Sequence, residues 1–288
     1  MTETRTETDS LGPVEVPASA LYGAQTTRAV ANFPISGLRA SPFLISALAM
    51  IKQAAAEANQ SLGLITPEQG SAIQQVAQEI IDGRHHDHFV VDVFQAGAGV
   101  SLHMNANEVI ANRAGQILGA PLGDYKKVHP NDHVNYGQST NDVFPTAMRL
   151  SALLALEDLD PVLGDLAGSF AAKAAEFKDI LKSGRTHMQD AVPITLGQEF
   201  AAYAVAIRKC HQHIARTAED LHALGLGGSA VGTGLNTHPD YRERAIANLS
   251  RISGLELRPA EDLRYAMQSN AAMANISAAL RTLALEVI

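Results

Sequence analysis

The sequence predicts an all-α, mainly helical protein, and three observations support this prediction. Apolar residues recur with the spacing of one helix face over long stretches of the 288-residue chain. Ala and Leu are abundant while aromatic residues make up only 5% of the chain, a balance that favours helices over sheets. Short polar or Gly-rich connectors separate the apolar stretches, and long helices joined by short connectors describe a helical bundle.

The first third of the chain predicts short elements. Residues 1–20 are polar and are expected to be extended or loose. A helix is expected to begin at Pro42, because Ser41 before it is a suitable N-cap and proline is tolerated at the first helical position. The same pattern predicts a second helix that has Thr66 as its cap and stops at Gly83.

Longer helices are predicted further along the chain. After a helix over residues 105–119, one is expected over about 142–181, with Pro161 as a kink or a break. Another is expected over about 196–224, and the last from about residue 261 to the end. All of these stretches consist of good helix formers with apolar residues at helical spacing.

The change from short to long helices predicts the domain organisation. We expect an N-terminal domain over residues 1–135 and a central helical-bundle domain over residues 136–288 that is incomplete at its C-terminal end. Hydrophobic residues make up 46% of the chain, which is enough for a sizeable core in each.

Composition and charge exclude several classes of function. The formal net charge of -8 argues against a nucleic-acid partner, because phosphate binding needs a basic surface. The N-terminus is unlike a signal peptide, and no apolar run is long enough to span a membrane. Cys210 is the only cysteine, which fits a reducing compartment, so we expect a cytoplasmic protein with a packed, inert thiol. Three histidines in residues 83–89 lack the spacing of metal ligands and predict a solvated loop.

A run of small hydrogen-bonding side chains stands out in "VHPNDHVNYGQSTNDVFPTAMRL". Pro145 must lie near the start of a helix. The N-terminus of that helix therefore holds Ser139, Thr140, Asn141 and Asp142. One N-cap needs only one such residue. Because a helix N-terminus offers free N–H groups and a positive dipole end, the extra donors could instead hold a carboxylate, and both interpretations stay open.

Three other connectors are built in a similar way. Residues 184–200 place His187 in a loop ahead of a helix, and Thr195 fits the start of a capping box for that helix. A histidine titrates near neutral pH and can serve there as a base, an acid or a donor to an anion. Residues 94–109 and 225–241 are Gly-rich without a nucleotide-binding fingerprint, and they predict clefts where the backbone approaches a small ligand.

Together, these connectors resemble those of the fumarase/aspartase superfamily. "QAGAGVSLHMNANEVIANRA", "HPNDHVNYGQSTNDVFPTAM", "GRTHMQDAVPITLGQEF" and "GGSAVGTGLNTHPDY" fall in the family's order and spacing, and "LYGAQTTRAVANFPIS" near the start matches as well. The resemblance implies a lyase that cleaves a C–N or C–O bond beta to a carboxylate and releases fumarate. It also implies a three-domain helical fold, a homotetramer with a twenty-helix core, and active sites that are each shared by three chains.

The resemblance further implies which residues bind the substrate. Ser139, Thr140 and Asn141 resemble the stretch that binds a carboxylate of a small dicarboxylate substrate. Val100 and Ser101 stand in the Gly-rich loop that belongs to the same substrate site in the family. No metal ion and no organic cofactor is expected.

Two further groups of site residues are implied. Thr186 and His187 resemble the pair that reaches the substrate from a neighbouring chain, and His187 is the expected catalytic residue. His129, Asn131 and Asp132 resemble a region near the active-site entrance that acts as a second anion site in fumarases.

The sequence departs from the family pattern at three places. Val100 stands where the family usually has Thr, and valine cannot donate a hydrogen bond to a carboxylate, although Ser101 can. His103 stands where the family usually has Asn. The chain also stops at Ile288, ahead of the family's Gly-Ser-Ser loop and its Met-Pro-x-Lys-x-Asn motif. We therefore expect a truncated chain that is inactive by itself.

Motif details favour aspartate ammonia-lyase, with fumarate hydratase as the alternative. "QDAVPITLGQEF", "GAGVS" and "PAEDLRYAMQS" resemble aspartases, whereas "GGSAVGTGLNTHP" and "LYGAQTTRAVANFPI" are closer to fumarases. A non-catalytic scaffold on the same fold is an alternative of another class. The polar residues retained in the connectors argue against it, because a scaffold does not need them.

Overall fold

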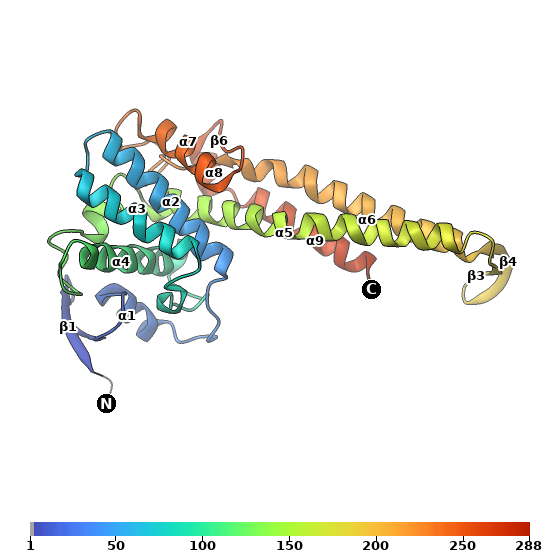
Figure 1. Ribbon diagram of the computed structural model, residues 1–288, viewed down its shortest axis with the longest axis horizontal. Coiled ribbons are helices and arrows are strands. Elements are labelled where there is room, and N and C mark those ends of the chain that lie inside the picture. The colour runs from blue at the N-terminus through green and yellow to red at the C-terminus, as the bar shows by residue number, and fades with distance from the viewer. Residues whose placement is uncertain (1–2) are drawn as a thin grey trace. The chain divides into compact units, whose positions relative to one another are not determined.

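The structure is a computed structural model that describes residues 3–288 (Figure 1). It confirms the mainly helical fold class, with a few short strands beside the helices. The chain forms two compact units. Unit 1 contains the residues up to Ser151 together with His222–Ser269, and unit 2 contains Ala152–Leu221 and Asn270–Ile288. The predicted domain boundary at residues 135/136 stays a prediction.

Unit 1 is built on short and medium helices. Its α-helices are α1 (Ala24–Asn32), α2 (Pro42–Ser61), α3 (Pro67–Ile81), α4 (Val100–Ile117), α7 (Tyr241–Ser253) and α8 (Leu263–Gln268). Single turns of other helix types are η1 (His86–His88), η2 (Gly97–Gly99) and the π-helical η3 (Pro130–Val134). Two strand pairs complete it: β1 (Thr4–Asp9) with β2 (Gly12–Pro17), antiparallel, and β5 (Ala223–Leu224) with β6 (Arg258–Pro259), parallel.

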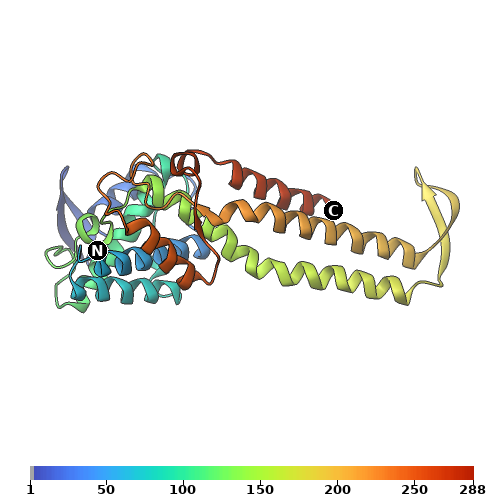
Figure 2. The ribbon, with the colours of Figure 1, turned by 90° about the horizontal axis from the view of Figure 1, so that it is seen from above.

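Unit 2 contains the long helices. Helix α5 (Thr140–Glu176) begins in unit 1 and continues into unit 2, where it is followed by α6 (Leu196–Ala218) and α9 (Ala271–Glu286). Figure 2 shows α6 and α9 lying side by side. Strands β3 (Leu181–Thr186) and β4 (Gln189–Thr195) form an antiparallel hairpin, and the 3-10 turn η4 (Glu219–His222) follows α6.

The predicted helix starts are confirmed by their caps. The Ser41 side chain accepts a hydrogen bond from the backbone of Leu44 at the start of α2. Thr66 forms a capping box at the start of α3, and Thr195 forms one at the start of α6. These caps depend on residues three positions apart, and a local sequence pattern can therefore predict them.

Three local expectations were wrong. Helix α5 continues through Pro161, so the alternative of a break there was wrong, while the alternative of a kink stays a prediction. Residues 181–195 form a β-hairpin rather than a loop. The last predicted helix is interrupted at Ser269, whose backbone is extended (φ -84°, ψ 128°), so that α8 and α9 are separate helices.

Helix α2 is the central helix of unit 1. It packs against α3 and α7, and it also contacts α4. Most of its residues are buried, including the side chain of Lys52, which is fully inaccessible to solvent. Burial of a cation this deep requires partners within the protein. Those partners connect α2 to the candidate site.

Helix α6 in unit 2 buries only one stripe of its surface. The buried side chains of this stripe are three or four residues apart: Ala204, Ile207, Cys210, Ile214 and Ala218. Cys210 is buried, which confirms the expectation of a packed cysteine, and burial raises the pKa of its thiol. Among residues 3–288, no helix has the length and apolar character needed to cross a bilayer.

The carboxylate of Glu79 links α3 to α4 and makes the stability of unit 1 pH-dependent. Arg113 donates to it at 3.0 Å and the ring of His85 lies 2.8 Å away. Burial alone raises the pKa of Glu79, but these hydrogen bonds outweigh burial and lower the pKa from 4.5 to about 2. Because the folded-state pKa is depressed, this stabilisation is present above the unfolded pKa and is lost as the pH falls toward 2.

Replacing Glu79 with Gln is expected to lower the free energy of unfolding by about 2–3 kcal/mol at pH 7. The difference between the variant and the unmodified protein should shrink steadily as the pH is lowered from 5 toward about 2. Denaturant unfolding at a series of pH values measures it. A difference that does not change with pH would mean that Glu79 contributes through packing rather than through its charge.

Candidate functional site

The first turn of α5 carries the polar run that the sequence singles out. The Ser139 hydroxyl accepts a hydrogen bond from the backbone of Asn141 (3.2 Å), so Ser139 caps the helix. The Asn141 side-chain amide donates to the carbonyl oxygen of Ala230 (2.8 Å). Thr140 is half-buried, and its hydroxyl lies 2.7 Å from Nδ1 of His103. One residue therefore caps the helix, and the side chains of the next two are held by other segments.

Asp142 joins this turn to the Gly-rich connector after β5. Its carboxylate accepts backbone hydrogen bonds from Ser139 (2.9 Å), Gly227 (3.0 Å) and Ser229 (3.0 Å). Burial raises the pKa of Asp142 to about 6, while the three backbone donors and the charge of Lys52 oppose the rise. The three backbone N–H donors favour the ionised form of this carboxyl group. The start of α5 therefore carries a buried negative charge held by backbone N–H groups.

Lys52 and His103 lie beneath the start of α5, and both are completely buried. Nζ of Lys52 is 2.8 Å from Nε2 of His103, 2.8 Å from Oδ1 of Asn135 and 2.9 Å from Oε1 of Gln138. Burial lowers the pKa of Lys52, and the nearby charge of Asp142 opposes this. Burial also lowers the pKa of His103, and the adjacent Lys52 lowers it further, so the imidazole is neutral at pH 7.

The Gly-rich turn before α4 meets α5 at close range. Ala98 and Gly99 both have positive φ angles of 61° and 75°. A Cβ atom at position 99 would lie 2.3 Å from the ring of Phe144, so only glycine fits between this turn and α5. Val100, the first residue of α4, is 36% exposed, whereas Ser101 is buried. Together with the bond between His103 and Thr140, this contact brings the starts of α4 and α5 together.

Three of the four predicted connectors therefore meet at one place. The segment 94–109 reaches Thr140 through His103, and the segment 225–241 reaches Asp142 and Asn141 through its backbone. The polar side chains at the start of α5 are therefore held by neighbouring segments on two sides.

The three residues of the predicted second anion site lie at the start of η3, where His129 is the N-cap. Nδ1 of His129 accepts hydrogen bonds from the backbones of Asn131 and Asp132, both at 3.2 Å. A neutral imidazole that accepts at Nδ1 carries its proton on Nε2. The Asp132 carboxylate lies 3.3 Å from the same ring nitrogen and is largely exposed. The structure thus brings the three residues together, with one acidic group among them.

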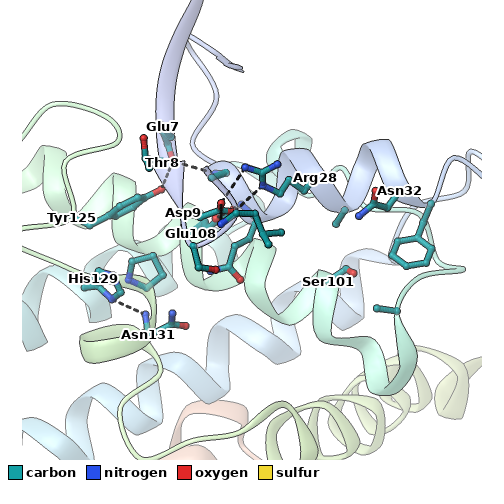
Figure 3. Close-up of a pocket in the computed structure, with 18 residues that line it drawn as sticks. Glu7, Thr8, Asp9, Arg28, Asn32, Ser101, Glu108, Tyr125, His129 and Asn131 are labelled. Carbon is teal, nitrogen blue, oxygen red and sulfur yellow. Dashed lines mark hydrogen bonds and ion pairs between the residues drawn. The ribbon is translucent and has the colours of Figure 1, made fainter. Parts of the chain in front are cut away.

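A cavity of about 550 Å³ lies between β1, α1, α4 and η3, and Figure 3 shows its lining. Ser101, His129 and Asn131 line it, so three predicted site residues share one cavity. Its main cation is already paired, because Arg28 donates to Asp9 through Nε (2.9 Å). The lining therefore carries one paired cation and two further carboxylates, Glu7 and Glu108.

Thr186 and His187 lie in unit 2, at the end of the β3–β4 hairpin. Thr186 pairs with Gln189, so the turn consists of His187 and Met188 alone. Both turn residues have positive φ angles, 48° and 61°, as a two-residue hairpin turn of type I′ requires. Both are exposed to solvent. The site residues are thus divided between the two units, with Thr186 and His187 in a different unit from the other predicted residues.

Lys52 is absent from the residues predicted from the sequence, and His103 stands out there only as a departure from the family pattern. The burial of Lys52 could have been predicted from its position in the helix. It falls four residues after the apolar Leu48 and three before Ala55, and this spacing places it on the apolar face. A lysine on the apolar face of a helix is rarely buried without a partner. The partners themselves are 51 and 86 residues away in the sequence, and a single sequence does not reveal them.

Comparisons with known proteins agree with this arrangement. A family model described as "Lyase" matches residues 12–288. A class II fumarate hydratase of Halobacterium salinarum is 52% identical over 93% of this chain and 57% of its own length. An aspartate ammonia-lyase of a Bacillus species is 47% identical over 97% of this chain and 60% of its own length. The chain belongs to the fumarase/aspartase lyase superfamily.

A solved structure of this superfamily has the same fold. The fumarate lyase:delta crystallin from Brucella melitensis, bound to cobalt, superimposes with a TM-score of 0.96 at 48% identity. The alignment covers 99% of this chain and 62% of that protein. The chain thus spans about three-fifths of the length of the superfamily members that it matches.

Proposed function

We propose that the intact protein is a lyase that releases fumarate by β-elimination, with L-aspartate as its substrate and ammonia as the second product. The observation that carries this proposal is the convergence of three connectors on the first turn of α5. The relatives named as aspartate ammonia-lyases, at 47% identity and above, support the reaction class. The aspartase-like motif "QDAVPITLGQEF" over residues 189–200 supports ammonia as the leaving group.

The chemistry explains why so many donors are needed. Removal of a proton alpha to a carboxylate places negative charge on that carboxylate as an aci-carboxylate develops. Fixed hydroxyl, amide and backbone N–H groups aimed at its oxygens stabilise this charge more in the transition state than in the ground state. We assign this role to Ser139, Thr140 and Asn141, with Ser101 as a further donor and Val100 as a contact without a hydrogen bond.

We assign the remaining predicted residues by the same reaction. His187 is the catalytic residue and Thr186 binds substrate, both reaching the site of another chain. His129, Asn131 and Asp132 are proposed as the second anion site, where Nε2 of His129 can donate to an anion. Neither a metal ion nor an organic cofactor has a role in this mechanism. We also place the protein in the cytoplasm, on the basis of its single cysteine.

Self-association into a homotetramer is part of the proposal. Exposed apolar side chains on the unit 2 helices support it, including Tyr203 (50% exposed) on α6 and Leu285 (63%) on α9. The β3–β4 hairpin likewise exposes Met188 (87%) and Val192 (65%). Apolar surface of this extent on a soluble chain indicates contacts with other chains.

Fumarate hydratase is the second candidate, and a specific observation favours it. The relative with 52% identity is a class II fumarate hydratase. The two reactions differ in the leaving group, ammonia or water, while the carboxylate-binding groups serve both. A non-catalytic scaffold on the same fold is less compatible with the polar network at the start of α5.

One assay on the intact protein separates these candidates. The ultraviolet absorbance of fumarate is followed in amine-free buffer, with and without ammonium. Consumption that requires ammonium identifies an aspartate ammonia-lyase. Consumption without ammonium identifies a fumarate hydratase. If the intact assembly neither consumes nor binds fumarate, the result supports the scaffold and overturns the proposal.

A further inference from the structure

The buried Lys52 has three acceptors in the positions that an ammonium group needs. The side-chain amides of Asn135 and Gln138 both direct oxygen toward Nζ, at 2.8 and 2.9 Å. Their orientation is fixed from the other side. Nε2 of Gln138 donates to the carbonyl oxygen of Val134 (3.1 Å), and Nδ2 of Asn135 donates to that of Gln138 (3.3 Å). Lys52 must therefore donate to both amide oxygens.

Burial lowers the pKa of Lys52, but the charge of Asp142 opposes this and favours the ammonium form. Asp142 is itself buried, and three backbone N–H groups donate to its carboxylate. A buried carboxylate without a nearby cation would carry a large desolvation cost. An ammonium group has three N–H bonds, and two of them go to Asn135 and Gln138. Nε2 of His103, 2.8 Å away, is placed to accept the third.

This donation decides the tautomer of His103. A ring nitrogen that accepts a hydrogen bond carries no proton, so the single proton of a neutral His103 must be on Nδ1. Nδ1 then donates to the hydroxyl oxygen of Thr140, 2.7 Å away. The Thr140 oxygen is thus an acceptor toward His103, and its own O–H is left to donate elsewhere.

A threonine hydroxyl inside a helix usually donates to the backbone carbonyl four residues earlier, but Thr140 has no such carbonyl within α5. Thr146, one and a half turns further along α5, donates to the backbone carbonyl of Asp142 four residues earlier (2.8 Å). Thr140 is the first residue of α5, so the carbonyl four residues before it lies outside the helix. Its hydroxyl hydrogen is free to point toward a ligand at the helix N-terminus.

We propose that Lys52 and His103 are positioning residues that fix the direction of the Thr140 hydroxyl, so that it donates to a carboxylate of the substrate. Lys52 donates to His103, His103 donates to Thr140, and Thr140 donates to the substrate oxygen. An asparagine at position 103 can keep the same direction, because its Oδ1 can accept from Lys52 while its Nδ2 donates to Thr140. A leucine at this position cannot. The inference rests on the proposed function for its substrate, but the direction of the hydrogen bonds does not depend on that function.

The first test locates the hydrogen atoms on Lys52 and His103 directly. Neutron diffraction from deuterium-exchanged crystals of the intact protein should show deuterium on Nδ1 of His103, none on its Nε2, and three deuterons on Nζ of Lys52. A deuteron on Nε2 together with a bare Nδ1 would overturn the inference. This measurement needs no activity, so its outcome is independent of whether the proposed reaction is correct.

The second test measures binding and turnover in a double-mutant cycle. His103→Leu is expected to raise the dissociation constant for fumarate about 10- to 100-fold, the size of one lost hydrogen bond to a charged group. His103→Asn should stay close to the unmodified protein. In the Thr140→Val background, His103→Leu should have little further effect, because the donor that it orients is already absent.

The outcomes separate the inference from the proposed function. If His103→Leu weakens fumarate binding equally with Thr140 present and absent, its role is structural and the inference is wrong. The inference is equally wrong if His103→Asn weakens binding as much as His103→Leu does. Failure of the unmodified intact protein to bind or consume fumarate would instead overturn the proposed function, and the neutron experiment would still decide the hydrogen-bond direction.

Discussion

Replacing His187 with Asn is expected to lower the turnover number of the intact protein by about 10²- to 10⁴-fold, the usual contribution of a positioned acid–base group. The hairpin should stay folded in this variant. His187 has a φ of 48°, in the left-handed region, and asparagine adopts that region more readily than most residues. The substitution removes the imidazole and keeps a side chain suited to the turn.

The neighbouring turn residue provides the matched control. Met188 also has a positive φ, 61°. Met188→Asn therefore places an asparagine at a left-handed position of the same turn, but it does not remove an imidazole. Steady-state turnover, together with circular dichroism and thermal unfolding, should show two folded variants of which only His187→Asn has lost activity. Retention of activity by His187→Asn would contradict the assignment of His187 as the catalytic residue. Equal losses in both variants would point to the shape of the turn instead.

The turn at His187 also shows why the hairpin could not be predicted from the sequence. Two-residue hairpin turns of type I′ are recognised by Asn-Gly or similar pairs, which tolerate positive φ angles. Here the pair is His-Met, and the flanking residues 181–195 contain a glycine and a proline that suggest a loop. A strained turn without the usual residues is often retained at a functional site. The local pattern failed at the position where we propose the catalytic residue.

Other features were predictable because their causes are local. The caps at Ser41 and Thr66 act on residues three positions away, and the polar run at Ser139 marks a real helix start. The interruption at Ser269 was not predictable from periodicity, because the apolar spacing continues across it. The buried network was least predictable, since Lys52 contacts His103 only after α2 and α4 have packed.

Replacing Asp142 with Ala is expected to lower the free energy of unfolding by about 3–5 kcal/mol, because three buried backbone N–H groups lose their acceptor. Its carboxylate is completely buried, and it accepts backbone hydrogen bonds from Ser139, Gly227 and Ser229. The variant leaves these donors without an acceptor and removes the negative charge that opposes the lowering of the Lys52 pKa by burial. Denaturant unfolding of the intact protein measures the change. Hydrogen exchange at the amides of Gly227 and Ser229 should become faster in the variant.

The expected loss of unfolding free energy in Asp142→Ala should come from the lost interactions of this buried carboxylate, and not from the removal of any carboxylate from α5. Asp158 lies on an exposed position of the same helix, and Asp158→Ala should change the free energy of unfolding by at most about 0.5 kcal/mol. Adding Lys52→Met to Asp142→Ala removes the unpaired cation, so the double variant should be less destabilised than the sum of the two single variants. Additive losses would mean that the two charges do not stabilise each other. Asp142 would then act only as an acceptor for backbone N–H groups. The ammonium form of Lys52 would be stabilised by the amide oxygens of Asn135 and Gln138 alone.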